Sequence, residues 1–339
     1  MNLLVIGGSG MLGYAIVKQS IQQGHHVRIL DLHAIEVADV ESVIGDITQY
    51  DDVLNACAGI DVVIHTASLV NLEQGKPPIL HEVNVIGTEN VIRACQQQGV
   101  RSLIYTSSID VVFDGTPIVN GDERLPYAKK HLDYYGETKA QAEKLVLAAN
   151  GEKDLTTSVI RSAGIYGPGD KHRFPAVIAN SLSGQFTRIG DGKAKFSHVY
   201  VENMAHAHIL LAEKLAPDSV SAGEIYFITD HAPSNFFDFF IPYLKALELD
   251  YQVQTIPASL ANIIAYLLEW RYILLKNESS RNVQLTRYTV ASVARDFWFN
   301  HDKATRDFGY HPIVSEEDAF ARTLNWLRNE WLPEYQANH

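Results

Sequence analysis

Unbroken apolar runs alternate with segments of helical periodicity through the first half of the chain. The first run, residues 3–6, contains no polar position, and residues 11–23 follow it with Leu12, Ile16 and Val17 on one face. An apolar run without alternation is typical of a strand buried on both sides in a parallel sheet. The pattern recurs, with strands expected at 26–30, 42–45, 61–65, 102–106 and 157–161 and helices at 79–98 and 131–149. This order predicts an α/β fold with a doubly wound parallel sheet of the Rossmann type.

A glycine-rich turn separates the first strand from the first helix. Gly7, Gly10 and Gly13 occur at three-residue spacing. The first glycine allows a tight turn, the second lets the backbone approach a pyrophosphate, and the third lets the helix pack closely on the strand. The free N–H groups at the start of the helix would hold the phosphates. The turn therefore indicates a dinucleotide-binding site, although such spacing alone is also common in structural turns.

An acidic residue ends the second strand. Asp31 lies about twenty residues after the glycines, where a carboxylate binds the adenosine ribose hydroxyls of a dinucleotide. A carboxylate there would repel a 2′-phosphate, and no arginine follows it directly. We therefore expect NAD as the cofactor in preference to NADP.

The alternation loosens after about residue 167, which suggests a second part of the chain. We expect helices at 174–183, 201–215, 236–247, 258–275 and 316–331, and a returning strand at 224–229. A length of 339 residues is compatible with two lobes. We predict an NAD-binding domain over 1–170, completed by the returning strand, and a smaller, mainly helical substrate-binding lobe over 171–339.

Composition and charge exclude several classes of function. The formal net charge of −12 argues against a nucleic-acid binder, which should display a basic face. The fourteen histidines form no HExxH motif and no Cys/His cluster, so we expect no metal site. Cys57 and Cys95 are read as buried thiols of a reducing compartment. The chain starts without a charged leader, and we expect a cytoplasmic protein.

Tyr135 and Lys139 lie four residues apart near the start of an expected helix, and so share one face. A phenol has a pKa near 10 and is a poor base at neutral pH. A neighbouring ammonium, or the positive ring of an oxidised nicotinamide, favours the phenolate. Tyr135 could then take a proton from an alcohol or give one to a ketone. Ser107 and Ser108 follow the strand at 102–106, and a hydroxyl there could hydrogen-bond the substrate oxygen.

Taken together, these motifs resemble the extended short-chain dehydrogenase/reductase family. The matching elements follow the family's order at 7–13, 31, 46–47, 65–68, 84–88, 105–108, 135–139 and 161–168. Within that family the chain is most similar to the 3β-hydroxysteroid dehydrogenase/isomerase (sterol dehydrogenase) branch. This closer likeness is carried by 105–112, 145–151, 164–170, 201–210 and 302–312. Two departures are Ile6, where many relatives have threonine, and Phe113, where glycine is usual.

The resemblance implies specific roles for individual residues. Tyr135 would be the acid/base, Lys139 its modulator and Ser108 the hydroxyl partner. Asn84 would lie near the nicotinamide end, and Asp46 and Ile47 would flank the adenine. His65 is read as a packed residue at a strand end. The expected cofactor-binding residues are Gly7, Gly10, Met11, Leu12, Gly13, Asp31, Asp46, Ile47, Thr66, Ala67, Ser68, Asn84, Tyr135 and Lys139.

Three functions compete. The first is NAD-dependent hydride transfer at a hydroxyl or ketone of a bulky apolar substrate, either a sterol or a long-chain β-hydroxy/keto acid. The second is a nucleotide-sugar epimerase or dehydratase, whose relatives often carry asparagine where this chain has Gly164, although Arg271, Arg281, Arg287 and Arg295 could meet a diphosphate. The third, a non-catalytic NAD-sensing protein, is disfavoured because Ser108, Tyr135 and Lys139 are all present.

The apolar segment 258–275 has two interpretations. It is interrupted by Glu269 and Arg271, and a spanning helix needs about twenty predominantly apolar residues. It could therefore form a buried helix or pocket wall, or lie at a membrane surface as a peripheral contact. The sequence leaves open whether the protein forms a homodimer.

Overall fold

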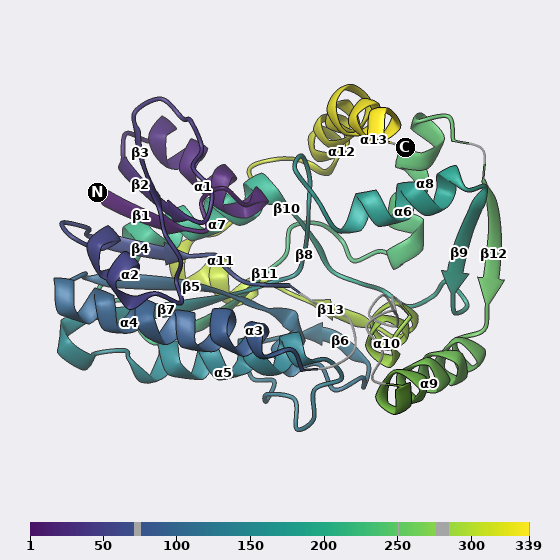
Figure 1. Ribbon diagram of the computed structural model, residues 1–339, viewed down its shortest axis with the longest axis horizontal. Helices are drawn as coiled ribbons and strands as arrows, with labels where there is room; N and C mark the ends of the chain where they lie inside the picture. The colour runs from purple at the N-terminus through teal and green to yellow at the C-terminus, as the bar shows by residue number, and fades with distance from the viewer. Residues whose placement is uncertain (71–75, 250, 276–284, 339) are drawn as a thin grey trace.

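Seven parallel strands form the central sheet in the order β11-β7-β5-β4-β1-β2-β3. The structure is a computed structural model and describes residues 1–70, 76–249, 251–275 and 285–338. The strands are β1 Asn2–Ile6, β2 His26–Asp31, β3 Val40–Ile44, β4 Val62–His65, β5 Ser102–Ser108, β7 Thr156–Ser162 and β11 Ile225–Ile228. The strand order reverses between β1 and β4, and the expected Rossmann-type fold is confirmed (Figure 1).

Helices cover both faces of this sheet. Successive strand side chains point to opposite faces, so Leu3 and Val5 join one core while Leu4 and Ile6 join the other. This two-sided burial is the reason why the strands read as unbroken apolar runs. The first face is covered by α1 Met11–Gln22, α7 Val201–Lys214 and α11 Asp302–Phe308, and the second by α2 Tyr50–Ala56, α4 Gly87–Gln98 and α5 Tyr134–Ala148.

The second half of the chain contributes one strand and two helices to the domain of the central sheet. That strand is confirmed as β11, which pairs with β7. The helices α7 and α11 also contribute to the core beneath the sheet. The division into two parts at residue 170 stays a prediction.

The rest of the second half lies to the right in Figure 1 and combines helices with short strand pairs. An aromatic core joins α6 Arg173–Leu182, α8 Phe236–Ala246 and α12 Glu316–Trp326. The short strands of this part pair with one another or with strands from before residue 170. Strands of three to five residues were not expected, because so short a pairing leaves little periodicity in a sequence. The paired strands are β8 Gly164–Tyr166 with β10 His198–Tyr200, β9 Gln185–Ile189 with β12 Gln252–Ile256, and β6 Ile118–Gly121 with β13 Phe297–Phe299. The remaining helices are α3 Pro78–His81, α9 Ala258–Leu275, α10 Arg287–Ala294 and α13 Leu332–Asn338.

Two element boundaries near the expected site differ from the prediction. The helix expected from residue 131 begins at Tyr134, because the carboxylate of Asp133 accepts a 2.6 Å hydrogen bond from the Gly136 amide and caps the helix. The strand expected to end at residue 106 continues through Ser108, which pairs in register with Ser162. Ser107 and Ser108 are therefore both part of β5 and are held in place by the sheet.

Candidate functional site

The glycine turn between β1 and α1 leaves no room for side chains. Gly7 has a φ of +87°, a left-handed conformation that glycine adopts readily. A Cβ on Gly13 would lie 2.0 Å from the carbonyl oxygen of Gly7, so the helix can approach the strand only with glycine there. Within the described residues, no side chain caps α1 at Gly10. The first N–H groups of α1 can therefore bind an anion, which fits the diphosphate of a dinucleotide.

Asp31 ends β2 beside this turn. One of its carboxylate oxygens accepts a 3.0 Å hydrogen bond from the Ser9 amide. The other accepts a longer bond, 3.3 Å, from the amide of His33. The side chain is thus fixed next to the glycines, and each oxygen keeps a further lone pair that can accept a ribose hydroxyl. This geometry fits the expected place of NAD.

The loop after β4 forms the next wall of the same edge. The amides of Thr66 and Ala67 both donate to the carbonyl oxygen of Ile6, at 2.9 and 3.0 Å. A Cβ on Gly7 would contact both residues. Asp46 and Ile47 follow β3 at the same edge of the sheet, where the carboxyl ends of parallel strands meet. The structure therefore brings the expected cofactor-binding residues of four strands to one edge.

Asn84 lies in a π-helical turn, Glu82–Ile86, between α3 and α4. Its amide oxygen accepts hydrogen bonds from the Ser68 hydroxyl at 3.1 Å and the Leu69 amide at 2.8 Å. Its amide nitrogen donates to Leu69 O and to the Thr138 hydroxyl, at 3.0 and 3.1 Å. These four bonds use the full hydrogen-bonding capacity of the side chain. Asn84 therefore joins the loop after β4 to α5, and this connecting role was not foreseen.

The predicted catalytic residues meet at the end of β5. Tyr135 lies in the first turn of α5 and hydrogen-bonds with Ser108 and Ser68. One turn further on, Lys139 donates a 2.6 Å hydrogen bond from Nζ to the Thr106 carbonyl oxygen. All three predicted catalytic side chains are buried. A proton donor or acceptor, a hydroxyl and an amine are thus grouped at the edge that carries the glycine turn.

Burial shifts the acid–base properties of this group. It raises the pKa of Tyr135, and the nearby carboxyls of Asp110 and Asp133 raise it further. The hydrogen bonds between Tyr135 and the hydroxyls of Ser108 and Ser68 lower its pKa and so act in the opposite direction. Burial also lowers the pKa of Lys139 to about 7, while Glu143 opposes that shift. In this structure the Tyr135 phenol is therefore stabilised in its protonated form.

Ser107 has a different role from Ser108. It points to the opposite side of β5, and its hydroxyl donates a 2.5 Å hydrogen bond to the Glu143 carboxylate. Glu143 also forms a buried ion pair with Arg161, at 2.7 Å, and accepts a hydrogen bond from Tyr127. This polar network lies behind Lys139 and supports α5 against β5 and β7.

Sequence reasoning assigned no role to three side chains beside Ser108. Asp110 accepts a 2.6 Å hydrogen bond from Ser108, and Asp133 caps α5 next to it. Tyr288, on α10, donates to Asp110 at 2.5 Å. The Ser-x-Asp spacing at 108–110 could have indicated the first contact, because Ser and Asp two apart often bond locally. Nothing in the sequence indicated Tyr288.

Several other expected residues are buried and packed in the interior. His65 is buried and hydrogen-bonded to Thr88, and burial lowers its pKa to about 3, so it is a packed neutral residue as expected. Phe113 is buried and stacks on Phe297, with 4.0 Å between the ring centroids. Cys57 and Cys95 are buried free thiols. Among the described residues no group of three or more His, Cys, Asp or Glu side chains could hold a metal ion.

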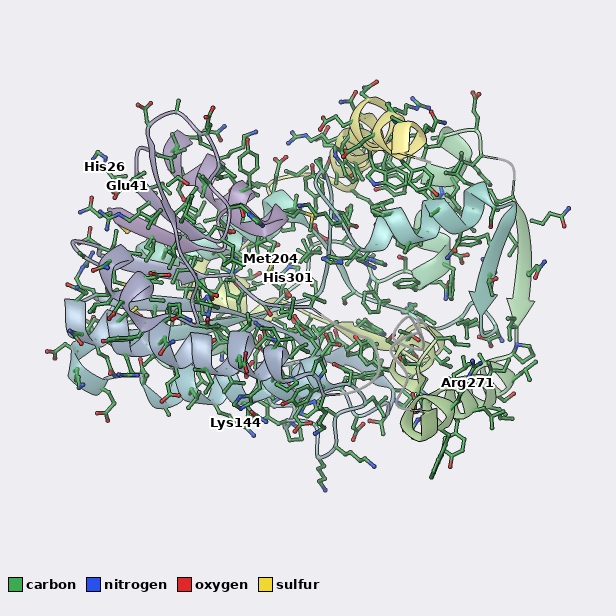
Figure 2. The ribbon with its side chains drawn as sticks, viewed as in Figure 1. His26, Glu41, Lys144, Met204, Arg271 and His301 are labelled. Atoms are coloured by element: carbon green, nitrogen blue, oxygen red, sulfur yellow. The ribbon has the colours of Figure 1, made fainter. Side chains whose placement is uncertain are left out.

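Two of the four late arginines form contacts elsewhere. Arg287 pairs with the buried Glu269 at 2.5 Å. Arg295 donates a hydrogen bond to the carbonyl oxygen of Gly115. Arg271 is exposed on α9, at the lower right of Figure 2, and Arg281 lies outside the described residues. These contacts weaken the diphosphate site that the epimerase interpretation needs.

Helix α9 has one buried and one exposed face. Ala261, Ala265 and Glu269 are buried against the remainder of the chain. The opposite face exposes Leu260, Ile263, Tyr266, Leu267 and Trp270. The segment is thus buried on one side only, and a pocket wall and peripheral membrane contact both stay predictions. Over the described part of the chain, no helix is both long and apolar enough to cross a bilayer.

The fold recurs in solved structures that contain bound NAD. A structure of MoeE5 in complex with UDP-glucose and NAD superimposes with a TM-score of 0.75 at 20% identity, covering 98% of this chain and 100% of that one. Thermus thermophilus UDP-glucose 4-epimerase in complex with NAD superimposes with a TM-score of 0.74 at 22% identity, covering 97% and 100% of the two chains. At this identity the likeness concerns the fold.

Sequence comparison is more specific. The chain is 37% identical to a 3-beta-hydroxysteroid dehydrogenase of Mycolicibacterium neoaurum, over 95% of this chain and 90% of the relative. It is 36% identical to the mouse sterol-4-alpha-carboxylate 3-dehydrogenase, decarboxylating, over 94% and 89%. The model of one family matches residues 4–258. The resemblance noted in the sequence is thereby confirmed, and the chain belongs to the 3-beta hydroxysteroid dehydrogenase/isomerase family.

Proposed function

We propose that the protein is an NAD-dependent dehydrogenase/reductase that interconverts a 3β-hydroxyl and a ketone on a sterol-like substrate. The observation that carries this proposal is the grouping of Ser108, Tyr135 and Lys139 at the end of β5, in a chain of this family. The names of the relatives support a steroid or sterol as substrate. A long-chain β-hydroxy or β-keto acid remains a second member of the same apolar substrate class.

Tyr135 is the proposed acid/base. In the oxidation direction its phenolate oxygen accepts the proton of the substrate alcohol, and in the reduction direction its phenol returns that proton to the ketone oxygen. NAD, when bound, supplies the hydride acceptor or, in its reduced form, the hydride donor. Ser108 would hydrogen-bond the substrate oxygen and keep it beside Tyr135. Lys139 would favour the phenolate and orient the nicotinamide ribose.

The glycine turn and its neighbours are the proposed cofactor site. Gly7, Gly10 and Gly13, with the amides of Met11 and Leu12, would hold the diphosphate, and Asp31 would bind the adenosine ribose. Asp46 and Ile47 would flank the adenine. Thr66, Ala67 and Ser68 would line the dinucleotide groove, with Asn84 holding that loop in place. Residues 171–339 would supply most of the apolar substrate contacts.

The proposal is tested by following NADH at 340 nm with a panel of substrates. The panel contains a 3β-hydroxysteroid, a sterol 4-carboxylate, a long-chain β-hydroxy acid and UDP-glucose. We expect NADH formation with the first two and none with UDP-glucose. An epimerase or dehydratase returns the hydride to the sugar and forms no net NADH, so UDP-glucose is followed by chromatography of the nucleotide sugar. Its conversion, together with inactivity toward every apolar alcohol, would reject the proposal in favour of the epimerase/dehydratase interpretation.

A further inference from the structure

A tyrosine from the second half of the chain contacts the predicted catalytic group indirectly. The Tyr288 hydroxyl donates a 2.5 Å hydrogen bond to Asp110 Oδ1, across a sequence separation of 178 residues. The other carboxylate oxygen of Asp110 accepts a 2.6 Å bond from the Ser108 hydroxyl. A continuous chain of two short hydrogen bonds therefore links α10 to the end of β5. Bonds of this length to a carboxylate are charge-assisted and strong.

The position of Tyr288 is fixed from several sides. Its side chain is buried, and its ring meets the edge of Phe113 at 6.2 Å between centroids. The start of α10 is held by Thr286, which forms a capping box with Thr289. The next residue, Arg287, pairs with Glu269 of α9. The Tyr288 hydroxyl consequently has a defined place in the site rather than a range of rotamers.

We propose that Tyr288 is a positioning residue that acts on Ser108 through Asp110. This inference rests on the proposed function of Ser108. A serine hydroxyl carries a single proton, and here that proton is directed to Asp110. The Ser108 oxygen is thereby left with lone pairs that can accept the hydrogen bond of the protonated Tyr135, and its rotamer is fixed. The second half of the chain thus completes the catalytic group as well as the substrate pocket.

The charge of Asp110 depends on all the groups that face it. Burial raises its pKa, whereas the hydrogen bonds from Ser108 and Tyr288 and the nearby His131 lower it. Asp133 faces it from the start of α5, and the proximity of Asp110, after burial, raises the pKa of Asp133 to about 7. Tyr135 lies within the field of both carboxyls. Removing the Tyr288 hydroxyl should therefore raise the pKa of Asp110 further.

The first test compares Tyr288→Phe with a matched control. Tyr226→Phe also removes a buried hydroxyl that bonds to a carboxylate, that of Asp307 at 3.2 Å, but in the core formed with α7 and α11 rather than beside Ser108. We expect Tyr288→Phe to lower kcat about tenfold with an unchanged KM for NAD. In this variant the acidic limb of the pH profile of kcat should also move to higher pH. Tyr226→Phe should leave both quantities at the wild-type values.

The second test asks whether Tyr288 acts through Ser108. In a Ser108→Ala background the tenfold effect of Tyr288→Phe should shrink to less than about twofold, because the group that it positions is missing. An effect of equal size in both backgrounds would overturn the proposal. If Tyr288→Phe does not fold, Asp110→Asn replaces it in the same double-mutant cycle with Ser108→Ala. Asparagine keeps the shape of the Asp110 side chain and removes its charge.

A third measurement needs no turnover and separates this inference from the proposed function. Carbon-13 NMR of protein labelled at the aspartate carboxyls, with Asp110→Asn for assignment, reports the titration of Asp110 in the free enzyme. Tyr288→Phe should move that titration to higher pH, and Tyr226→Phe should not. An unmoved titration would overturn the link even in an active enzyme. If the wild-type enzyme is inactive on the whole substrate panel but Tyr288→Phe still shifts the Asp110 titration, the proposed function is rejected. The hydrogen-bonded connection from Tyr288 to Asp110 is then still supported.

Discussion

The side-chain nitrogen of Lys139 lies 2.6 Å from the carbonyl oxygen of Thr106, and the lysine is almost fully buried. This bond joins α5 to β5 two residues before Ser108. The amine also lies 4.2 Å from the centre of the Tyr105 ring. Lys139 is therefore held against the sheet, and burial is the main cause of the lowered pKa of its amine.

The pKa of Lys139 leads to a prediction about stability and pH. Because the folded pKa is lowered to about 7, the folded protein loses this proton at a lower pH than the unfolded chain, where lysine titrates near 10.4. Between these values the unfolded state binds more protons, so this lysine makes stability rise with pH. We expect Lys139→Met to remove that rise in urea unfolding from pH 6.5 to 9.5 without cofactor. Lys193→Met, at an exposed position, serves as the control.

Replacement of Tyr135 tests the proposed acid/base. Tyr135→Phe should abolish turnover while NAD still binds, because only the proton-transferring hydroxyl is lost. The measurements are NADH formation and calorimetric titration with NAD. Tyr134→Phe, at the neighbouring half-buried position, should keep most of the activity. Full activity of the Tyr135→Phe variant would contradict the mechanism.

Replacement of Asp31 tests cofactor choice. Asp31→Ala removes the carboxylate that would repel a 2′-phosphate, so the ratio of kcat/KM for NADP to that for NAD should rise, by about tenfold for about 1.4 kcal/mol of relieved repulsion. Asp51→Ala, on the exposed side of α2, should leave the ratio unchanged. An unchanged ratio in Asp31→Ala as well would argue against the ribose-binding role.

The buried pair of Glu143 and Arg161 should contribute strongly to folding. Glu143→Gln keeps the shape of the side chain but leaves a buried guanidinium without its carboxylate, which typically costs about 3–5 kcal/mol. We expect a loss of this size in the free energy of unfolding measured with urea. The exposed pair of Arg101 and Asp61, 3.9 Å apart, gives the comparison, since Arg101→Ala should cost about 0.5 kcal/mol or less. Equal losses would show that burial of the first pair is not what matters.

The sequence by itself determined the sheet and the residues gathered at its edge. Unbroken apolar runs such as 3–6 predict buried parallel strands, because every side chain there meets a helix on one face or the other. The glycine turn at 7–13, Asp31 and the Tyr135–Lys139 spacing are local patterns, and each lies within one strand–helix unit. Local patterns can be read without knowing how distant segments pack.

The tertiary structure alone decided which distant groups surround Ser108. The contact between Tyr288 and Asp110 spans most of the chain, and no periodicity or spacing records it. The same holds for the amide of Asn84, whose four bonds join the loop after β4 to α5. The raised pKa of Tyr135 and the lowered pKa of Lys139 also depend first on burial, which the sequence does not record. Desolvation and hydrogen-bond direction are properties of the packed molecule, and they arise only when segments that are distant in the sequence fold together.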